Sequence, residues 1–309
     1  MVIGTIIFSA SSGLAEVLIS PVIAAIPAEN PDREMSKLHS VYAWGVVGVV
    51  IISTVFLLVF GEKNWQWLVL FFMLVPLTAS ILFRFSNIPK LETPQRVSGA
   101  LNMLKNKTLW LCVIAIFIGG ASECTMAQWS SGYLEQAMGI PKIWGDIFGV
   151  ALFGVMLGLG RSMYAKIGKH IERVLFFGVV GSAFCYLIAA VSSVPIVGLL
   201  ACGFTGFCAS MLWPGCLVAA SNRIPNSGVF LYAMMAAGGD LGASVGPQLV
   251  GVITDVAMET KYVINLANEW GMTSEQLGMK CGMLMGMLFP LFGIIVFLYI
   301  MKTKGKYYE

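Results

Sequence analysis

The sequence is poor in charge and in the residues that usually carry enzyme chemistry. Of its 309 residues, 11% are charged and 58% are hydrophobic, whereas soluble domains carry about 25% charged residues. It has only two histidines, and its seven cysteines have no CxxC spacing, so neither a metal site nor a disulfide framework is expected. Walker A, GxSxG and HExxH motifs are absent, as are basic aromatic strips. We therefore expect neither an enzyme nor a primary pump nor a nucleic-acid-binding protein, and no cofactor.

Long apolar runs take the place of these features. Runs of about 20 residues without alternation cross a hydrocarbon core as α-helices. Nine stretches reach this length: 4–27, 39–60, 65–84, 108–134, 144–164, 174–193, 195–221, 228–254 and 281–301. The predicted fold class is an all-α, polytopic membrane helical bundle whose surroundings are a lipid bilayer.

The basic residues are distributed unevenly between the two sides of this bundle. Of 19 Lys and Arg residues, 15 fall in the odd-numbered loops and the C-terminal tail, which leaves Lys63, Lys142, Lys261 and Lys280 for the other side. Basic loops face the cytoplasm. We predict a multi-pass protein of the cell membrane with a cytoplasmic C-terminus and, because it has nine spans, an N-terminus outside.

The spans divide into two unequal groups. Residues 85–107 contain two prolines and five charged residues and are predicted to be a cytoplasmic linker. The linker separates residues 1–84, with three spans, from residues 108–309, with six. The first group is interpreted as the remnant of an N-terminal helical bundle, and the second as a C-terminal six-helix bundle.

An internal repeat bears on this inequality. Gly13, Pro21 and Gly45 recur as Gly, Pro and Gly at positions 206, 214 and 238. Parallel repeats of six spans are the plan of one large transporter fold. The sequence distance between the two copies is the same for all three residues. Subtracted from the start of the six-span unit near Thr108, this distance places the start of its partner before Met1. We therefore expect a twelve-span plan that lacks its first three helices.

Several stretches resemble the major facilitator superfamily, and in particular its fucose-permease-like branch of proton/sugar symporters. These stretches are Glu16 with Pro21, residues 33–45, Gly119–Glu123 with Trp129, residues 158–170 (GLGRSMYAKIGKH), and residues 238–247 (GGDLGASVGP). They are similar to parts of helices four, five, seven, eight to nine and eleven of that branch. The resemblance implies alternating access between two helical bundles, with protons and a small solute as partners. An acidic residue expected in the branch's first helix is missing.

Glu16 lies in the middle of the first apolar run. Ser9, Ser12, Gly13 and Ser20 recur with it at helical spacing, which makes one small, polar stripe on an otherwise apolar helix. A carboxylate at this depth is costly and is expected to face a water-filled cavity or a partner. We interpret Glu16 as a proton-binding or substrate-binding residue; the alternative is a hydrogen-bonded acid between helices without a transport role.

Glu123 lies in the middle of the fourth span, with Gln128 and Trp129 close by. Aromatic rings and hydrogen-bonding groups together suit a sugar, whose faces are apolar and whose edges carry hydroxyls. Glu123 is therefore a substrate or proton candidate, and Gln128 and Trp129 are candidate substrate contacts. A structural acid near the outer end of the helix is the alternative for Glu123.

Four further residues are candidates for packing or gating. Asp240 lies in a stretch where Gly239, Ala243 and Gly246 form a small-xxx-small face for close helix contact. Trp213 and Pro214 mark a predicted kink, because proline removes a helical hydrogen bond. Arg161 is interpreted as part of a basic cluster of cytoplasmic loop residues, whose charge membrane topology and contact with anionic lipid would explain. The alternative is a salt bridge at a gate.

The sequence thus predicts secondary transport of a small polar solute, a sugar in the first place, by proton-coupled alternating access. Two alternatives remain: a drug or metabolite exporter of the same fold, and a truncated membrane remnant that transports nothing.

Overall fold

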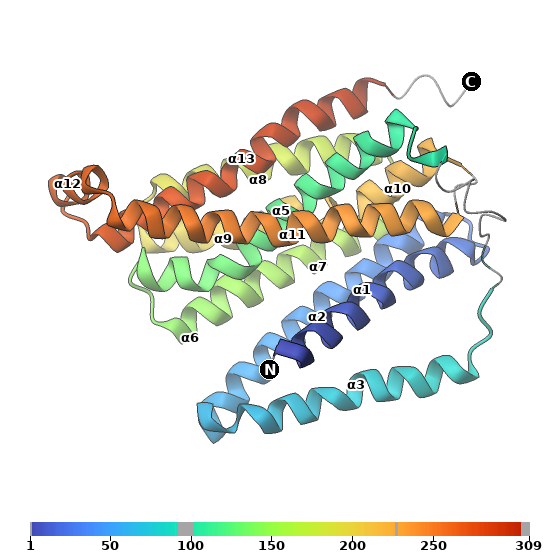
Figure 1. The fold of residues 1–309 in the computed structure, drawn as a ribbon, viewed down its shortest axis with the longest axis horizontal. Coiled ribbons are helices and arrows are strands. Elements are labelled where there is room, and N and C mark those ends of the chain that lie inside the picture. The colour runs from blue at the N-terminus through green and yellow to red at the C-terminus, as the bar shows by residue number, and fades with distance from the viewer. Residues whose placement is uncertain (1, 90, 92–101, 226–227, 304–309) are drawn as a thin grey trace.

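The computed structural model describes residues 2–89, 91, 102–225 and 228–303. Every regular element in these ranges is a helix, and nine helical segments within them are long and apolar enough to cross a membrane (Figure 1). This confirms the predicted all-α membrane bundle. The helices that correspond to the first four predicted spans are α1 (Val2–Ala25), α2 (Pro31–Phe60), α3 (Trp65–Phe85), which follows the short η1 (Glu62–Asn64), and α5 (Lys107–Gln136).

Two of the other five spans are interrupted: the seventh breaks at the predicted kink of Trp213 and Pro214, whereas the interruption of the fifth was not predicted. The fifth is built from α6 (Lys142–Gly145), the π-helix η2 (Asp146–Ala151) and α7 (Leu152–Ile167), and the seventh from α9 (Pro195–Ala209) and α10 (Pro214–Arg223). The remaining elements are α8 (Ile171–Val191), α11 (Gly228–Glu259), the short α12 (Lys261–Glu269) and α13 (Ser274–Lys302).

Helix α2 begins well before the predicted start at residue 39. The side-chain oxygen of Asn30 accepts a hydrogen bond of 3.1 Å from the backbone N–H of Arg33, and Pro31 occupies the first helical position. Asparagine before a helix and proline at its first turn are strong start signals. The predicted boundary was wrong because it followed the apolar run, whereas this helix is extended at its start by a polar turn and its cap.

Helix α5 lies at the centre of the second group of helices, between α11, α13 and α9. Glycines allow the close approach: a Cβ atom added at Gly246 would lie 2.9 Å from the carbonyl oxygen of Ala121, and one added at Gly119 would lie 2.5 Å from that of Leu212. Small residues at helix contacts let backbones touch in membranes, where packing drives association. The α5–α11 contact is therefore a closely packed seam of this bundle.

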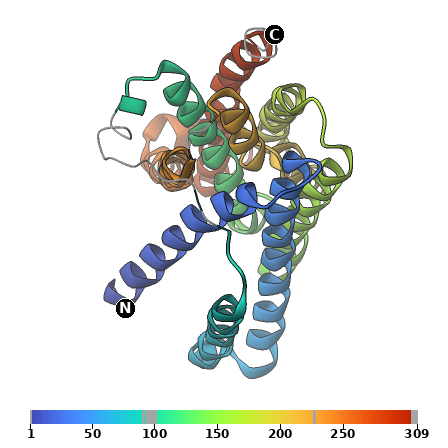
Figure 2. The ribbon, with the colours of Figure 1, turned by 90° about the vertical axis from the view of Figure 1, so that its right-hand side faces the viewer.

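Helices α1, α2 and α3 lie on one side of this bundle, and α3 is the farthest from it, as the two ribbon views show (Figures 1 and 2). Helix α2 packs along α7, and α1 touches α11 and α2 near its C-terminal half, where Ser20 and Pro21 are buried. Among the described residues of α3, Leu68 alone is buried. Part of the 85–107 linker, residues 90 and 92–101, lies outside the described residues.

Candidate functional site

A cavity of about 430 Å³ lies where α1 and α2 meet α5, α7 and α11. Its wall holds three acidic residues and one arginine: Glu16, Glu123, Asp240 and Arg161. The other lining residues are Ser12, Ile19, Ser20, Leu38, His39, Tyr42, Cys124, Trp213 and Ala243. Ionisable side chains inside a membrane bundle mark ligand or ion pathways, so this cavity is the candidate functional site.

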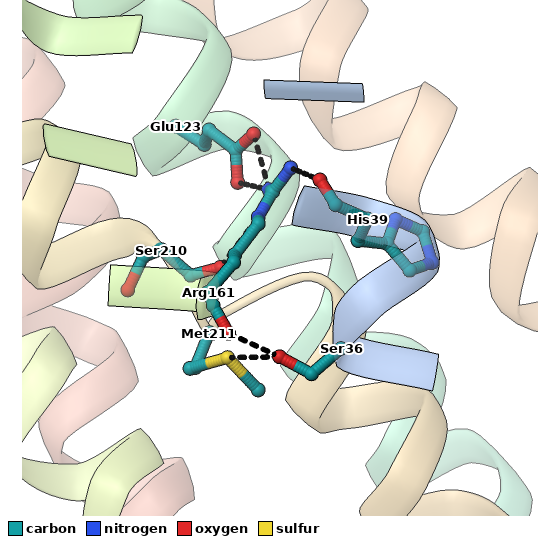
Figure 3. A network of polar contacts seen from close by, with 6 residues as sticks. All are labelled: Ser36, His39, Glu123, Arg161, Ser210 and Met211. Carbon is teal, nitrogen blue, oxygen red and sulfur yellow. Dashed lines mark hydrogen bonds and ion pairs between the residues drawn. The ribbon is translucent and has the colours of Figure 1, made fainter. Parts of the chain in front are cut away.

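The strongest polar contact in the cavity joins Arg161 and Glu123 (Figure 3). The Nη2 atom of Arg161 lies 2.8 Å from both carboxylate oxygens of Glu123, and the two side chains are 1% and 7% exposed. The ring of Tyr42 lies 5.7 Å from the guanidinium carbon. Removing one partner from such a buried pair leaves an uncompensated charge and costs about 3–5 kcal/mol.

Arg161 also reaches two main-chain carbonyls on other elements. Its Nε donates a 2.8 Å hydrogen bond to the carbonyl of Ser210, and its Nη1 donates a 3.0 Å bond to the carbonyl of His39 in α2. In a continuous helix the Ser210 carbonyl would accept from the N–H four residues later, but that residue is Pro214, which has no N–H. The helix break before α10 therefore provides an acceptor for the arginine.

The contact between α2 and α7 continues on both sides of Arg161. The hydroxyl of Ser36 donates a 2.7 Å bond to the main-chain carbonyl of Arg161, and the hydroxyls of Ser40 and Ser162 lie 2.7 Å apart. At the end of α7, Arg33 donates a 3.3 Å bond to the carbonyl of Ile167. Helix α2 is therefore held to α7 by polar contacts that begin at its first turn.

Glu16 on α1 and Asp240 on α11 both line the cavity. The side chain of Trp213 interacts with the carboxylate of Glu16. The Trp213 ring fits against α5 and α11 because Gly120 and Gly239 carry no side chain: an added Cβ would come within 2.9 Å and 2.6 Å of the ring. Asp240 faces the cavity, whereas the close helix contact of α11 is made by its glycines.

Gln128 and Trp129 lie outside this cavity. They line a separate pocket of about 730 Å³ on α5 and α11, together with Gln248 and Asp255. The indole N–H of Trp129 donates a 3.0 Å hydrogen bond to the carbonyl of Pro247. The structure thus brings Glu16, Glu123, Asp240, Arg161 and Trp213 together, but separates the two expected substrate contacts from them.

The interpretation of Arg161 as part of a loop cluster was wrong. Lys166, Lys169 and Arg173 are exposed, but Arg161 is turned inward and buried. Sequence reasoning also missed His39 and Tyr42 as cavity residues. The only signal for them was helical spacing: they lie three residues apart in α2, on the face that carries Ser36 and Ser40.

No group of three or more His, Cys, Asp and Glu side chains capable of holding a metal ion occurs among the described residues. Among the residues that line the cavity, His39 has a buried ring nitrogen, Nε2, without a hydrogen-bond partner in the described chain. Buried polar atoms are usually paired, so this atom is an exception, and in this conformation it is closed to water.

Comparisons with known proteins agree with this architecture. The family model described as Major Facilitator Superfamily matches residues 1–247. No curated protein matches the sequence significantly. Among solved structures, the chain is similar in fold to a variant of the E. coli fucose:proton symporter FucP, with a TM-score of 0.65 and 14% sequence identity. The similarity covers 96% of this chain and 76% of that one.

Proposed function

We propose a transport mechanism for this chain, which belongs to the Major Facilitator Superfamily. Members of this family are membrane transporters, and we infer that this one carries a small polar solute, a sugar in the first place, coupled to protons. The observation that supports the proposal best is the cavity in which three acids and a buried arginine meet, at the contact between α1–α2 and α5–α11. Such a site can bind a solute and a proton together.

Coupling would proceed through Arg161. Its charge is balanced by Glu123, while its Nη1 holds α2 through the His39 carbonyl. A proton bound to Glu123 would remove the negative charge from the pair, and Arg161 would lose its ionic partner within the cavity. The arginine could then leave its carbonyl acceptors, and the contact between α2 and α7 would loosen. Glu123 is accordingly a proton-binding residue and Arg161 a gating residue.

Glu16 and Asp240 would act on the solute or on a second proton. Both acids line the cavity, and both are attached to helices that touch one another, α1 and α11. Trp213 interacts with Glu16 and offers its ring as an apolar surface beside the carboxylates of the cavity. An apolar ring beside hydrogen-bonding groups suits a sugar. Gln128 and Trp129 would contact the solute only when it lies outside the central cavity, in the pocket that they line.

The orientation of the chain follows from its basic loops. The α7–α8 turn and the end of α13 carry Lys166, Lys169 and Lys302, and the rule that basic loops stay inside places them in the cytoplasm. The contact between the start of α2 and the end of α7 would then close the cytoplasmic side of the cavity. We propose a location in the cell membrane with the start of α1 outside.

Uptake into vesicles tests the proposal. The purified chain is reconstituted, and the uptake of radiolabelled hexoses and 6-deoxyhexoses is followed with and without an inward proton gradient. We expect accumulation that a protonophore abolishes. Glu16→Gln should abolish accumulation, whereas Glu259→Gln, which changes an exposed acid at the end of α11, should retain it.

Other outcomes identify the alternatives. Gradient-driven uptake that is unchanged in Glu16→Gln would overturn the role of this residue in binding the solute or a second proton. Accumulation that needs the opposite proton gradient would identify an exporter. Absence of gradient-driven uptake and of exchange across the whole solute panel would contradict the sugar-transport proposal and favour a chain that transports nothing.

A further inference from the structure

A hollow of about 320 Å³ lies on the outer surface of the helical bundle, between α7, α8 and α9. Its floor includes Gly160 and Gly178, and its sides include the exposed apolar side chains of Met163, Ile167 and Phe177. From residue 160 to residue 167 the helix rises about 10 Å, so the hollow is a groove roughly two helical turns long. It reaches the α7–α8 turn, which Figure 2 shows at the periphery of the bundle.

The groove ends at a group of positive charges. Arg173 is one of its lining residues, and Lys166 and Lys169 are exposed on the same turn. Within the described part of the chain, none of these three side chains forms an ion pair. His170 gives α8 no side-chain cap, so the positive end of the α8 dipole lies beside Lys169. The acidic neighbour Glu172 is buried.

We propose that this groove binds an anionic phospholipid. One acyl chain would lie between α7 and α8 against the two glycines, and the phosphate of the headgroup would contact Arg173 and Lys169. Two observations favour this occupant over an apolar or peptide partner. The apolar part of the groove lies within membrane-spanning helices, and its charged end lies where these helices leave the membrane. Basic pockets between spans at that level match anionic headgroups.

The groove is distinct from the transport cavity, although the two share the helix α7. Gly160 lines the groove, and the next residue, Arg161, points into the cavity. Ser210 lines the groove as well, and its carbonyl accepts the hydrogen bond from Arg161. A bound lipid would therefore fill space directly behind the residues that hold Arg161 in place.

Native mass spectrometry of the full chain in detergent tests this site. Phosphatidylglycerol or phosphatidylcholine is added at equal concentration, and the lipid retained by the protein is measured. We expect preferential retention of phosphatidylglycerol. Arg173→Gln should lower its retention about fivefold, the effect of one basic side chain at an anionic lipid surface. Ile167→Trp, which fills the groove without a change of charge, should also lower it.

The matched control is Arg84→Gln, because Arg84 is an exposed arginine in the last turn of α3, away from the groove. It should retain phosphatidylglycerol as the unchanged protein does. Should Arg173→Gln not fold, Lys169→Gln takes its place with the same expected direction. Equal retention of the two lipids, an equal loss in Arg84→Gln, or unchanged retention in Ile167→Trp would each overturn the proposal. None of these results depends on which solute the protein carries.

Discussion

Arg161 in α7 is hydrogen-bonded to the main chain of His39 in α2, with 3.0 Å between Nη1 and the carbonyl oxygen. Because the acceptor belongs to the backbone, its presence depends on where α2 lies and not on which side chain occupies position 39. A substitution of His39 can therefore leave this bond intact, whereas a displacement of α2 breaks it. Arg161 in α7 therefore keeps this bond only while α2 stays in its place beside α7.

The buried ion pair gives a first prediction. Arg161→Gln should destabilise the folded protein by about 3–5 kcal/mol, because Glu123 then stays buried without its counter-charge. The double change Arg161→Gln with Glu123→Gln should recover part of this loss, which denaturant unfolding in micelles would measure. Lys142→Gln, in the exposed pair with Asp146, should cost about 1 kcal/mol or less. A double variant as unstable as the single one would contradict this account.

The helix break before α10 gives a second prediction. Pro214→Ala supplies the missing N–H, which then competes with Arg161 for the Ser210 carbonyl. We expect slower hydrogen exchange in residues 210–215, as the helix becomes continuous, and weaker proton-driven uptake. Pro290→Ala, in the middle of α13, should change neither quantity. Unaltered exchange in residues 210–215 of Pro214→Ala would show that the proline does not keep this carbonyl available.

The seam between α5 and α11 gives a third. A methyl group at position 246 would lie 2.5 Å from the Thr125 hydroxyl and 2.9 Å from the Ala121 carbonyl, so Gly246→Ala should cost about 1–3 kcal/mol. Gly132→Ala is the matched control on α5: nothing lies within 4 Å of its added methyl group, and alanine favours the helix. Thermal unfolding of both variants measures the difference, and equal stability would argue against a tight seam.

The contact of α2 with α7 gives a fourth. The hydroxyls of Ser40 and Ser162 are 2.7 Å apart, so cysteines at both positions lie within reach of a disulfide. In a background without the seven native cysteines, oxidation of the double variant should form the bond and stop uptake, and reduction should restore it. Single cysteine variants should be insensitive to oxidant. Full uptake by the cross-linked protein would show that α2 and α7 stay together during transport.

Much of the fold follows from local composition. A run of about 20 apolar residues has no favourable alternative to a membrane helix, and the nine spans could be read from the sequence for this reason. The start of α2 was misplaced because a capping asparagine and a proline, rather than hydrophobicity, decide where it begins. The break before α10 was predicted as a kink, because Pro214 removes a helical hydrogen bond. The π-helix η2 was not predicted, because it depends on packing against neighbouring helices, which a periodic pattern does not contain.

Individual site residues could be predicted from the sequence, but not which of them lie together. Burying a carboxylate in a span is costly, so Glu16 and Glu123 stood out in the sequence. Their surroundings did not: Arg161 is 38 positions from Glu123, and only the way in which α5 and α7 pack turns the two side chains toward each other. The same limit applies to Gln128 and Trp129, which are close to Glu123 in sequence but line another pocket.

The isolation of α3 has a consequence for how the protein responds to its membrane. Its 21 residues form a helix about 31 Å long, close to the thickness of a hydrocarbon core. Exposed Trp65 and Trp67 at one end and Arg84 at the other are interfacial anchors. Because Leu68 alone of this helix is buried against the described chain, few intramolecular contacts fix its tilt, which is expected to follow bilayer thickness. A thicker or thinner membrane would therefore change the angle of α3 before it altered the packing of α5 against α11.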